Sequence, residues 1–195
     1  MQFIEPPICK QCGQHIPSQG LCTRCRVLSS QMEAVRSMVV FEGPVRKALH
    51  RIKYQQDFSL AGIFANSLES FFLNQLNWSV DMVIPVPLSK RRKMQRGYNQ
   101  AALLAKPLAS KLEFHYSNQA LKRVCETRSQ VGLSLEERRN NVADVFRASP
   151  VVKNKNILIV DDIATSGSTL ESCANALKQA GAKDIFGLTL ARAVL

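Results

Sequence analysis

The sequence lacks any uninterrupted hydrophobic run of the about 18 residues that a transmembrane helix needs. The best candidate, residues 63–80, is broken by polar side chains: Asn66, Glu69, Asn74, Gln75 and Asn77. The N-terminus, MQFIEPPICK, also lacks the basic start and apolar stretch of a secretory signal. These absences predict a cytoplasmic protein with no membrane insertion.

Acidic residues are scarce relative to basic ones. The 195-residue chain has 15 Asp and Glu against 26 Lys and Arg, which gives a formal net charge of +11. Such a surplus favours a polyanionic partner, either phosphate esters or nucleic acid, although a basic protein without such a partner is the alternative. Repeats and low-complexity segments are absent, and the length predicts one domain with a small appendage.

Six cysteines are present, and four of them form the pattern C-x2-C-x9-C-x2-C: Cys9, Cys12, Cys22 and Cys25. Two such pairs can supply four thiolates to a closed tetrahedral site, which is typical of structural Zn²⁺. An iron–sulfur cluster uses the same ligands and is the alternative, whereas disulfides are disfavoured in a reducing cytosol. We therefore predict a zinc-binding module over residues 1–36, followed by a main domain over residues 37–195.

The C-terminal part of the chain predicts a βαβ unit. Residues 157–160 form a continuous apolar run, as in a buried parallel strand, and residues 185–190 are predicted to form the next strand. Between them, Leu170, Cys173, Ala174 and Leu177 have helical spacing, and Ser168 with Glu171 matches a capping box. A βαβ unit predicts an α/β fold with a parallel sheet.

The segment between this strand and this helix, residues 161–169, predicts a phosphate-binding loop. Small residues allow a ligand to approach the backbone, hydroxyl groups add donors, and the helix N-terminus favours an anion. The segment has neither the Lys of a Walker loop nor the G-x-G-x-x-G of a dinucleotide-binding loop. The adjacent Asp161 and Asp162 suit vicinal sugar hydroxyls or hydrated Mg²⁺.

The segment VDDIATSGST resembles the motif with which type I phosphoribosyltransferases bind phosphoribosyl pyrophosphate (PRPP). The resemblance implies a mostly parallel sheet flanked by helices, with Asp161 and Asp162 on the ribose hydroxyls. It further implies that the 5′-phosphate is held by Ala164, Thr165, Ser166, Gly167, Ser168 and Thr169. The pyrophosphate, bridged by Mg²⁺, would lie near Pro87, Leu88, Ser89 and Lys90.

Nearly the whole chain resembles the competence protein F (ComF) family. The resemblance rests on the double C-x2-C, on VIPVPLSKRRKMQRGYNQA, and on a spaced pattern that includes Arg123, Thr127, Gln130, Leu133, Arg138 and Asn141. It implies the handling of single-stranded DNA in natural transformation, with an ATP-driven DNA translocase as a partner. It also implies a flexible loop that closes over the PRPP site and includes Arg123, Thr127, Arg128 and Gln130. A sister branch is linked to gluconate utilisation and iron–sulfur assembly.

A basic cluster with a neighbouring aromatic residue follows the predicted strand at residues 82–86: Lys90, Arg91, Arg92, Lys93, Arg96 and Tyr98. Such a cluster suits a single-stranded DNA backbone and one stacked base, although the same charges also suit pyrophosphate. No residues that would specify a nucleobase acceptor are evident. An active phosphoribosyltransferase that releases pyrophosphate from PRPP therefore remains an alternative to a DNA-handling protein.

Overall fold

A computed structural model describes residues 1–125 and 145–193. Its helices are α1 (Thr23–Val27), α2 (Gly43–Tyr54), α3 (Phe58–Gln75), α4 (Lys90–Arg96), α5 (Gln100–Lys111), a short 3₁₀ helix η1 (Pro150–Val152) and α7 (Ser168–Gln179). Its strands are β1 (Ala34–Val40), β2 (Met82–Pro85), β3 (His115–Tyr116), β4 (Leu121–Arg123), β5 (Phe146–Ala148), β6 (Ile157–Ala164) and β7 (Ile185–Arg192). Three residues predicted for the flexible loop, Thr127, Arg128 and Gln130, lie outside the described residues.

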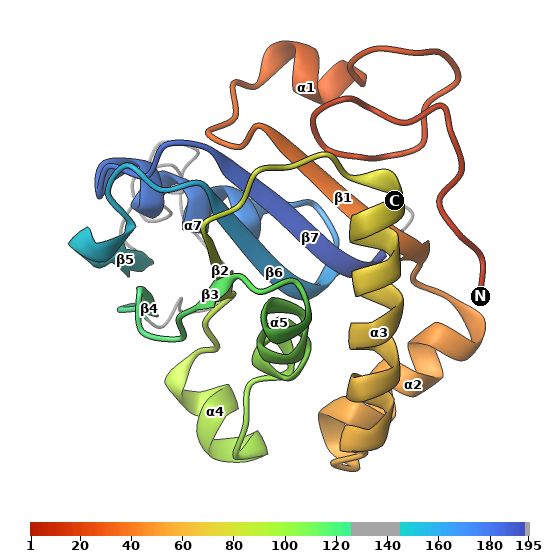
Figure 1. Cartoon of the computed structure of the whole chain (residues 1–195). Helices are drawn as coiled ribbons and strands as arrows, with labels where there is room; N and C mark the ends of the chain where they lie inside the picture. Colours follow the sequence, from red (N-terminus) through yellow and green to blue (C-terminus); the bar gives the residue numbers. More distant parts are fainter. Residues whose placement is uncertain (126–144, 194–195) are drawn as a thin grey trace, which may run out of the picture.

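The main sheet has five parallel strands in the order β1-β7-β6-β2-β3 (Figure 1). Strands β4 and β5 form a separate antiparallel pair. The predicted βαβ unit is present as β6, α7 and β7. The mostly parallel sheet flanked by helices confirms the predicted fold class.

The side chains of β6 alternate between two hydrophobic cores, because successive residues of a strand point to opposite faces. Ile157 and Ile159 pack in the core that contains α7, whereas Leu158 and Val160 pack in the core that contains α2, α3 and α5. Both faces of the sheet are thus covered by helices, which explains why this strand is continuously apolar.

The segment before the sheet, residues 1–33, follows the outer edge of β1. The backbone N–H of Val35 donates to Gln11 O at 2.6 Å, and that of Val40 donates to Gln2 O at 2.9 Å. These bonds cover a strand edge that would otherwise be open to pairing with another chain. The predicted boundary between residues 36 and 37 falls inside β1, since this strand already begins at Ala34.

The basic cluster after β2 forms helix α4. The Ser89 side chain accepts a hydrogen bond from the N–H of Arg92, and Gly97, with φ of 78°, ends the helix.

Among the described residues, no helix is both long and apolar enough to cross a membrane.

Candidate functional site

Asp161 and Asp162 lie on strand β6, near its carboxyl end. Both are predicted from the sequence to lie in the loop, but β6 continues to Ala164 because it stays paired with β7 through Ala164 and Arg192. Parallel strands also place the segment after β2 beside these residues, since Pro85 is in register with Val160. The aspartates and the predicted pyrophosphate loop, residues 87–90, therefore lie at the same edge of the sheet.

Asp162 is held by two partners from different helices. Its side chain is almost fully buried and forms an ion pair with Lys53 at the end of α2. Its Oδ1 also accepts a hydrogen bond from Gln100 Nε2 on α5 at 3.4 Å. The pairing with Lys53 offsets the cost of burying the carboxylate charge.

Asp161 is in a different electrostatic environment from its neighbour. Burial of the carboxyl group, followed by the negative charge of Asp162, raises the pKa of Asp161 well above its usual range. The positive charge of Lys53 opposes that rise, but its effect on the pKa of Asp161 is the smallest of the causes. The two carboxyl groups thus differ, one paired and one disfavoured in its charged form.

The loop proper is short and covers residues 165–167. Gly167 has φ of 78° and takes the N-cap position of α7, where a left-handed backbone favours glycine. The hydroxyl groups of Ser166 and Ser168 are hydrogen-bonded at 2.9 Å, and Thr165 and Thr169 are exposed. Hydroxyl groups and the start of α7 therefore converge on one accessible spot, as a phosphate site requires.

The predicted capping box of α7 is wrong, because Gly167 rather than Ser168 is the N-cap residue, and the N–H of Ser168 donates to Ser166 Oγ at 3.4 Å. Glu171 instead accepts hydrogen bonds from Ser30 Oγ at 2.6 Å and from the N–H of Gln31 at 2.7 Å. The glutamate therefore anchors the N-terminal segment to α7.

A second contact joins the N-terminal segment to the loop itself. Arg24 on α1 donates from its guanidinium to the carbonyl oxygen of Ser166. At the end of β7, Arg192 Nη1 donates to the carbonyl oxygen of Cys12 at 2.8 Å. The cysteine segment is thus tied to the sheet edge that carries the loop.

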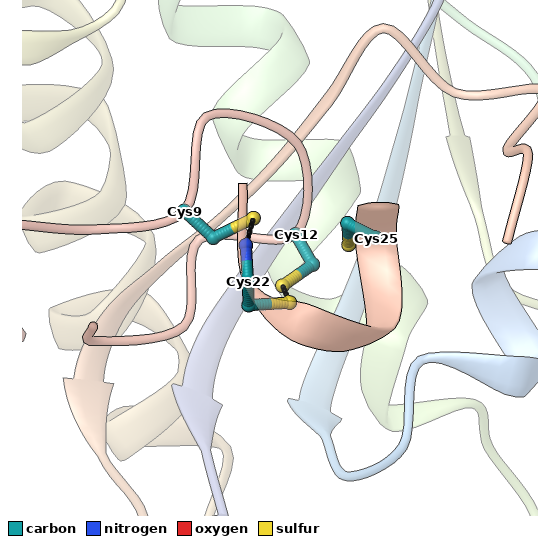
Figure 2. A group of neighbouring side chains, drawn as sticks. All are labelled: Cys9, Cys12, Cys22 and Cys25. Atoms are coloured by element: carbon teal, nitrogen blue, oxygen red, sulfur yellow. Dashed lines mark hydrogen bonds between the residues drawn. The ribbon is translucent and has the colours of Figure 1, made fainter. Parts of the chain in front are cut away.

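The four predicted metal ligands gather at one point in the N-terminal segment (Figure 2). The Sγ atoms of Cys9, Cys12, Cys22 and Cys25 all lie within 4.8 Å of one another, and those of Cys12 and Cys22 are 3.7 Å apart. Tetrahedral zinc with Zn–S bonds of about 2.3 Å separates its sulfur ligands by about 3.8 Å. The cluster could therefore hold a metal ion such as zinc.

The surroundings of the cluster favour the thiolate form of Cys9 and disfavour that of Cys25. Although burial opposes it, backbone N–H donors from Cys22, Cys12 and Gln11 lower the pKa of the Cys9 thiol to about 6. Burial, followed by neighbouring sulfur groups, raises the pKa of Cys25. A dication among the four sulfurs would relieve that mutual repulsion.

Only some of the basic residues of α4 line a cavity. Arg92 and Arg96, with Tyr98 just after the helix, line a cavity of about 480 Å³ together with Lys53, Tyr54, Gln56 and Gln95. Lys90, Arg91 and Lys93 are exposed and do not line this cavity. Pro87, Leu88 and Ser89 form the partly buried connection from β2 to α4.

Arg123 is the one predicted flexible-loop residue within the described part of the chain. Its Nε donates to the carbonyl oxygen of Cys125 at 3.3 Å, and its guanidinium lies 5.6 Å from the centre of the Phe146 ring.

Three residues at the site are not predicted from the sequence: Lys53, Gln100 and Arg24. Lys53 belongs to a helix face whose basic residues are expected to be solvent-exposed, and Arg24 directly precedes Cys25. No spacing in the sequence brings Lys53 and Gln100 to Asp162 or Arg24 to the loop, because these contacts depend on the tertiary fold.

Comparisons with known proteins agree with this architecture. The family model described as "Phosphoribosyl transferase domain" matches residues 60–193. Competence protein F of Haemophilus influenzae is 33% identical over 199 residues, which cover 96% of this chain and 85% of that protein.

Two further relatives are similar over most of the chain. The DNA utilization protein YhgH of Escherichia coli K12 is 29% identical over 184 residues, with 90% of this chain and 79% of that protein covered. Competence protein ComFC of Bacillus subtilis is 26% identical over 202 residues, with 98% and 80% covered. With its parallel sheet, its four-cysteine cluster and these matches, the chain belongs to the competence protein F (ComF) family and carries a phosphoribosyl transferase domain.

Proposed function

We infer that the protein handles single-stranded DNA in the cytoplasm during natural transformation, and that it carries a Mg²⁺-dependent site for PRPP or a related phosphosugar. An ATP-driven DNA translocase is the partner that we expect for it. The family supports the competence role, and the names of its relatives refer to competence and to DNA utilization.

One observation carries the phosphosugar site: two aspartates and a small-residue loop share the carboxyl edge of a parallel sheet. This edge is where open α/β sheets bind ligands. In the proposed site, Asp161 and Asp162 accept hydrogen bonds from the ribose hydroxyls, and residues 164–169 surround the 5′-phosphate. Mg²⁺ accompanies the pyrophosphate near residues 87–90, since phosphate and carboxylate oxygens are its preferred ligands.

The DNA-binding residues in this proposal are Lys90, Arg91, Arg92, Lys93, Arg96 and Tyr98. Positive charges beside an aromatic ring suit a single strand of any sequence. The cysteine cluster supplies a structural zinc site in the same proposal, and it stabilises a segment with few large apolar side chains.

The test measures pyrophosphate release from Mg²⁺-PRPP by the purified protein, with nucleobases, amines and single-stranded DNA as acceptors. We expect PRPP to bind without release, so that the domain serves as a binding module. Release that the Asp161→Ala/Asp162→Ala variant loses would instead make the protein an active phosphoribosyltransferase and would identify its acceptor.

A parallel measurement tests the DNA-handling part. Fluorescence anisotropy of a labelled oligothymidylate at about 50 mM salt should report binding that weakens as salt is added. An affinity that does not change with salt, or no binding at this salt concentration, would contradict the proposal.

A further inference from the structure

A basic and aromatic cavity lies between the end of α2 and helix α4. Tyr54 is 63% exposed beside it, and the Arg96 guanidinium lies 5.2 Å from the centre of the Tyr54 ring. Two contacts hold the Tyr98 side chain in place. Its hydroxyl donates to the carbonyl oxygen of Ile52, and its ring packs edge-on against Phe58. The cavity thus combines positioned cations with aromatic surface.

Residues at the end of α2 and just past it line one side of this cavity. Gln56, just past the helix, has φ of 55°, a left-handed conformation that favours glycine at this position. Its side chain nevertheless lines the cavity with Lys53 and Tyr54. Three neighbouring positions of the chain therefore contribute to one wall.

Two cations of the cavity connect to the same carboxylate at the phosphosugar site. Lys53 is paired directly with Asp162. Arg96 Nη1 donates to Gln100 Oε1 at 3.0 Å, and Gln100 Nε2 in turn donates to Asp162 Oδ1. Direct contacts therefore link the cavity to the Asp162 carboxylate.

We propose that this cavity binds a phosphate and an adjacent base of single-stranded DNA, and that Lys53 couples it to the phosphosugar site so that each ligand strengthens binding of the other. The inference rests on the proposed function and deepens it. It adds Lys53, Tyr54 and Gln56 of α2 to the DNA site, and it fixes the sign of the interaction between the two ligands.

The sign follows from competition for the Lys53–Asp162 ion pair. A DNA phosphate in the cavity attracts the Lys53 ammonium away from Asp162, which leaves the carboxylate free to accept ribose hydroxyls. A phosphosugar at Asp162 displaces Lys53, which leaves the ammonium free for the DNA phosphate. Because coupling between two binding sites is reciprocal, each ligand raises the affinity for the other by the same factor.

Pyrophosphate from PRPP has the same phosphate chemistry and could reach these cations from the loop after β2. The aromatic lining favours DNA, since Tyr54 and Tyr98 offer surfaces for a base, whereas pyrophosphate has no ring to stack. The position of the cavity beside the exposed basic residues of α4 also suits a continuing strand.

The experiment measures oligothymidylate affinity by fluorescence anisotropy, with and without saturating Mg²⁺-PRPP. It also measures PRPP affinity alone by calorimetry. Tyr54→Ala and Arg92→Ala alter the cavity at exposed positions. Lys53→Met removes the ammonium group that the two sites share. Lys106→Met, at an exposed position of α5, is the matched charge control. Circular dichroism verifies that each variant is folded.

We expect Tyr54→Ala and Arg92→Ala each to weaken DNA binding about five-fold or more, with PRPP affinity and Lys106→Met unchanged. PRPP should tighten DNA binding by the parent about five-fold, and Lys53→Met should abolish that gain. If Lys53→Met does not fold, two measurements still decide the proposal. The first is the DNA affinity of Tyr54→Ala and Arg92→Ala, and the second is the effect of PRPP on the DNA affinity of the parent.

Other outcomes overturn the inference in distinguishable ways. Normal DNA binding by Tyr54→Ala and Arg92→Ala would show that the strand lies elsewhere, with the proposed function intact. Arg92→Ala that loses PRPP rather than DNA affinity would assign the cavity to pyrophosphate. PRPP that leaves DNA affinity unchanged, or weakens it, would overturn the coupling. A parent that binds no DNA would contradict both this inference and the proposed function.

Discussion

At the scale of single residues, the two adjacent aspartates of β6 affect the stability of the fold differently. Asp162 is buried against Lys53 and Gln100, whereas Asp161 has a raised pKa because of burial and the neighbouring negative charge. A carboxyl group with a raised pKa in the folded state stabilises the fold at low pH. That contribution is lost as the pH rises through the folded-state pKa.

Substitution by asparagine should therefore act in opposite directions at the two positions. Asp162→Asn leaves the Lys53 ammonium without its partner and should destabilise the protein by about 2 kcal/mol, a loss of roughly 4–8 °C in Tm. Asp161→Asn removes a disfavoured charge and should raise Tm at pH 8. Thermal unfolding followed by circular dichroism measures both changes.

The pH dependence separates this account from a simple loss of packing. The advantage of Asp161→Asn over the parent should shrink as the pH falls, because the parent carboxyl group then becomes neutral as well. An advantage that is constant between pH 8 and pH 5, or that grows on acidification, would contradict the raised pKa of Asp161.

Gly167 is a second residue whose role can be measured. Its φ of 78° is strained for any residue with a side chain, although a Cβ at this position would meet no atom within 4 Å. Gly167→Ala should therefore destabilise the protein by about 1 kcal/mol through the backbone alone. Denaturant unfolding measures this cost, and an unchanged midpoint would show that the loop relaxes freely.

At the scale of elements, the cysteine segment supports the loop before α7 from outside the sheet. Arg24 of α1 reaches Ser166, and Glu171 of α7 reaches back to Ser30 and Gln31. Arg24→Ala should weaken phosphosugar binding about five-fold, because one exposed charge-assisted hydrogen bond that holds the loop is lost. Calorimetry with PRPP measures the change.

Arg26→Ala is the matched control, since Arg26 lies on the same helix but donates to Leu21 within the cysteine segment. Metal analysis should find the same zinc content in both variants. Equal PRPP affinity in Arg24→Ala and Arg26→Ala would show that the cysteine segment does not support the loop.

Removal of the metal should affect one element more than the rest. Cys12→Ser should lower the bound zinc from one ion per chain and expose residues 1–33 to proteolysis, because metal binding stabilises this segment. The sheet should persist, since its strands are buried between two helical layers. Bound iron with visible absorption in the parent would identify the alternative, an iron–sulfur cluster.

Local patterns in the sequence predict much of the fold and the metal centre. The apolar run predicts β6, the mostly apolar segment after α7 predicts β7, the 3.6-residue spacing predicts α7, and the C-x2-C pairs predict the cysteine cluster. The end of β6 is not predictable in this way, because polar Asp161 and Asp162 look like a loop until pairing with β7 extends the strand. Lys53, Gln100 and Arg24 meet the site only through tertiary packing.

At the scale of the whole molecule, the net charge of +11 has one direct consequence. DNA binding should weaken with salt along a log–log slope of roughly −0.7 for each phosphate contacted. Arg92→Ala should make this slope shallower by the contribution of one phosphate, whereas Lys106→Met should leave it unchanged. A titration between about 50 and 200 mM salt measures the slope.

The most direct test of the central claim is calorimetric titration of Mg²⁺-PRPP into the parent protein and into the Asp161→Ala/Asp162→Ala variant. Both samples are measured well below their melting temperatures, and circular dichroism verifies that both are folded. The account predicts saturable binding by the parent and no measurable binding by the variant. Equal affinity in the two proteins would contradict the assignment of the phosphosugar site to the carboxyl end of β6.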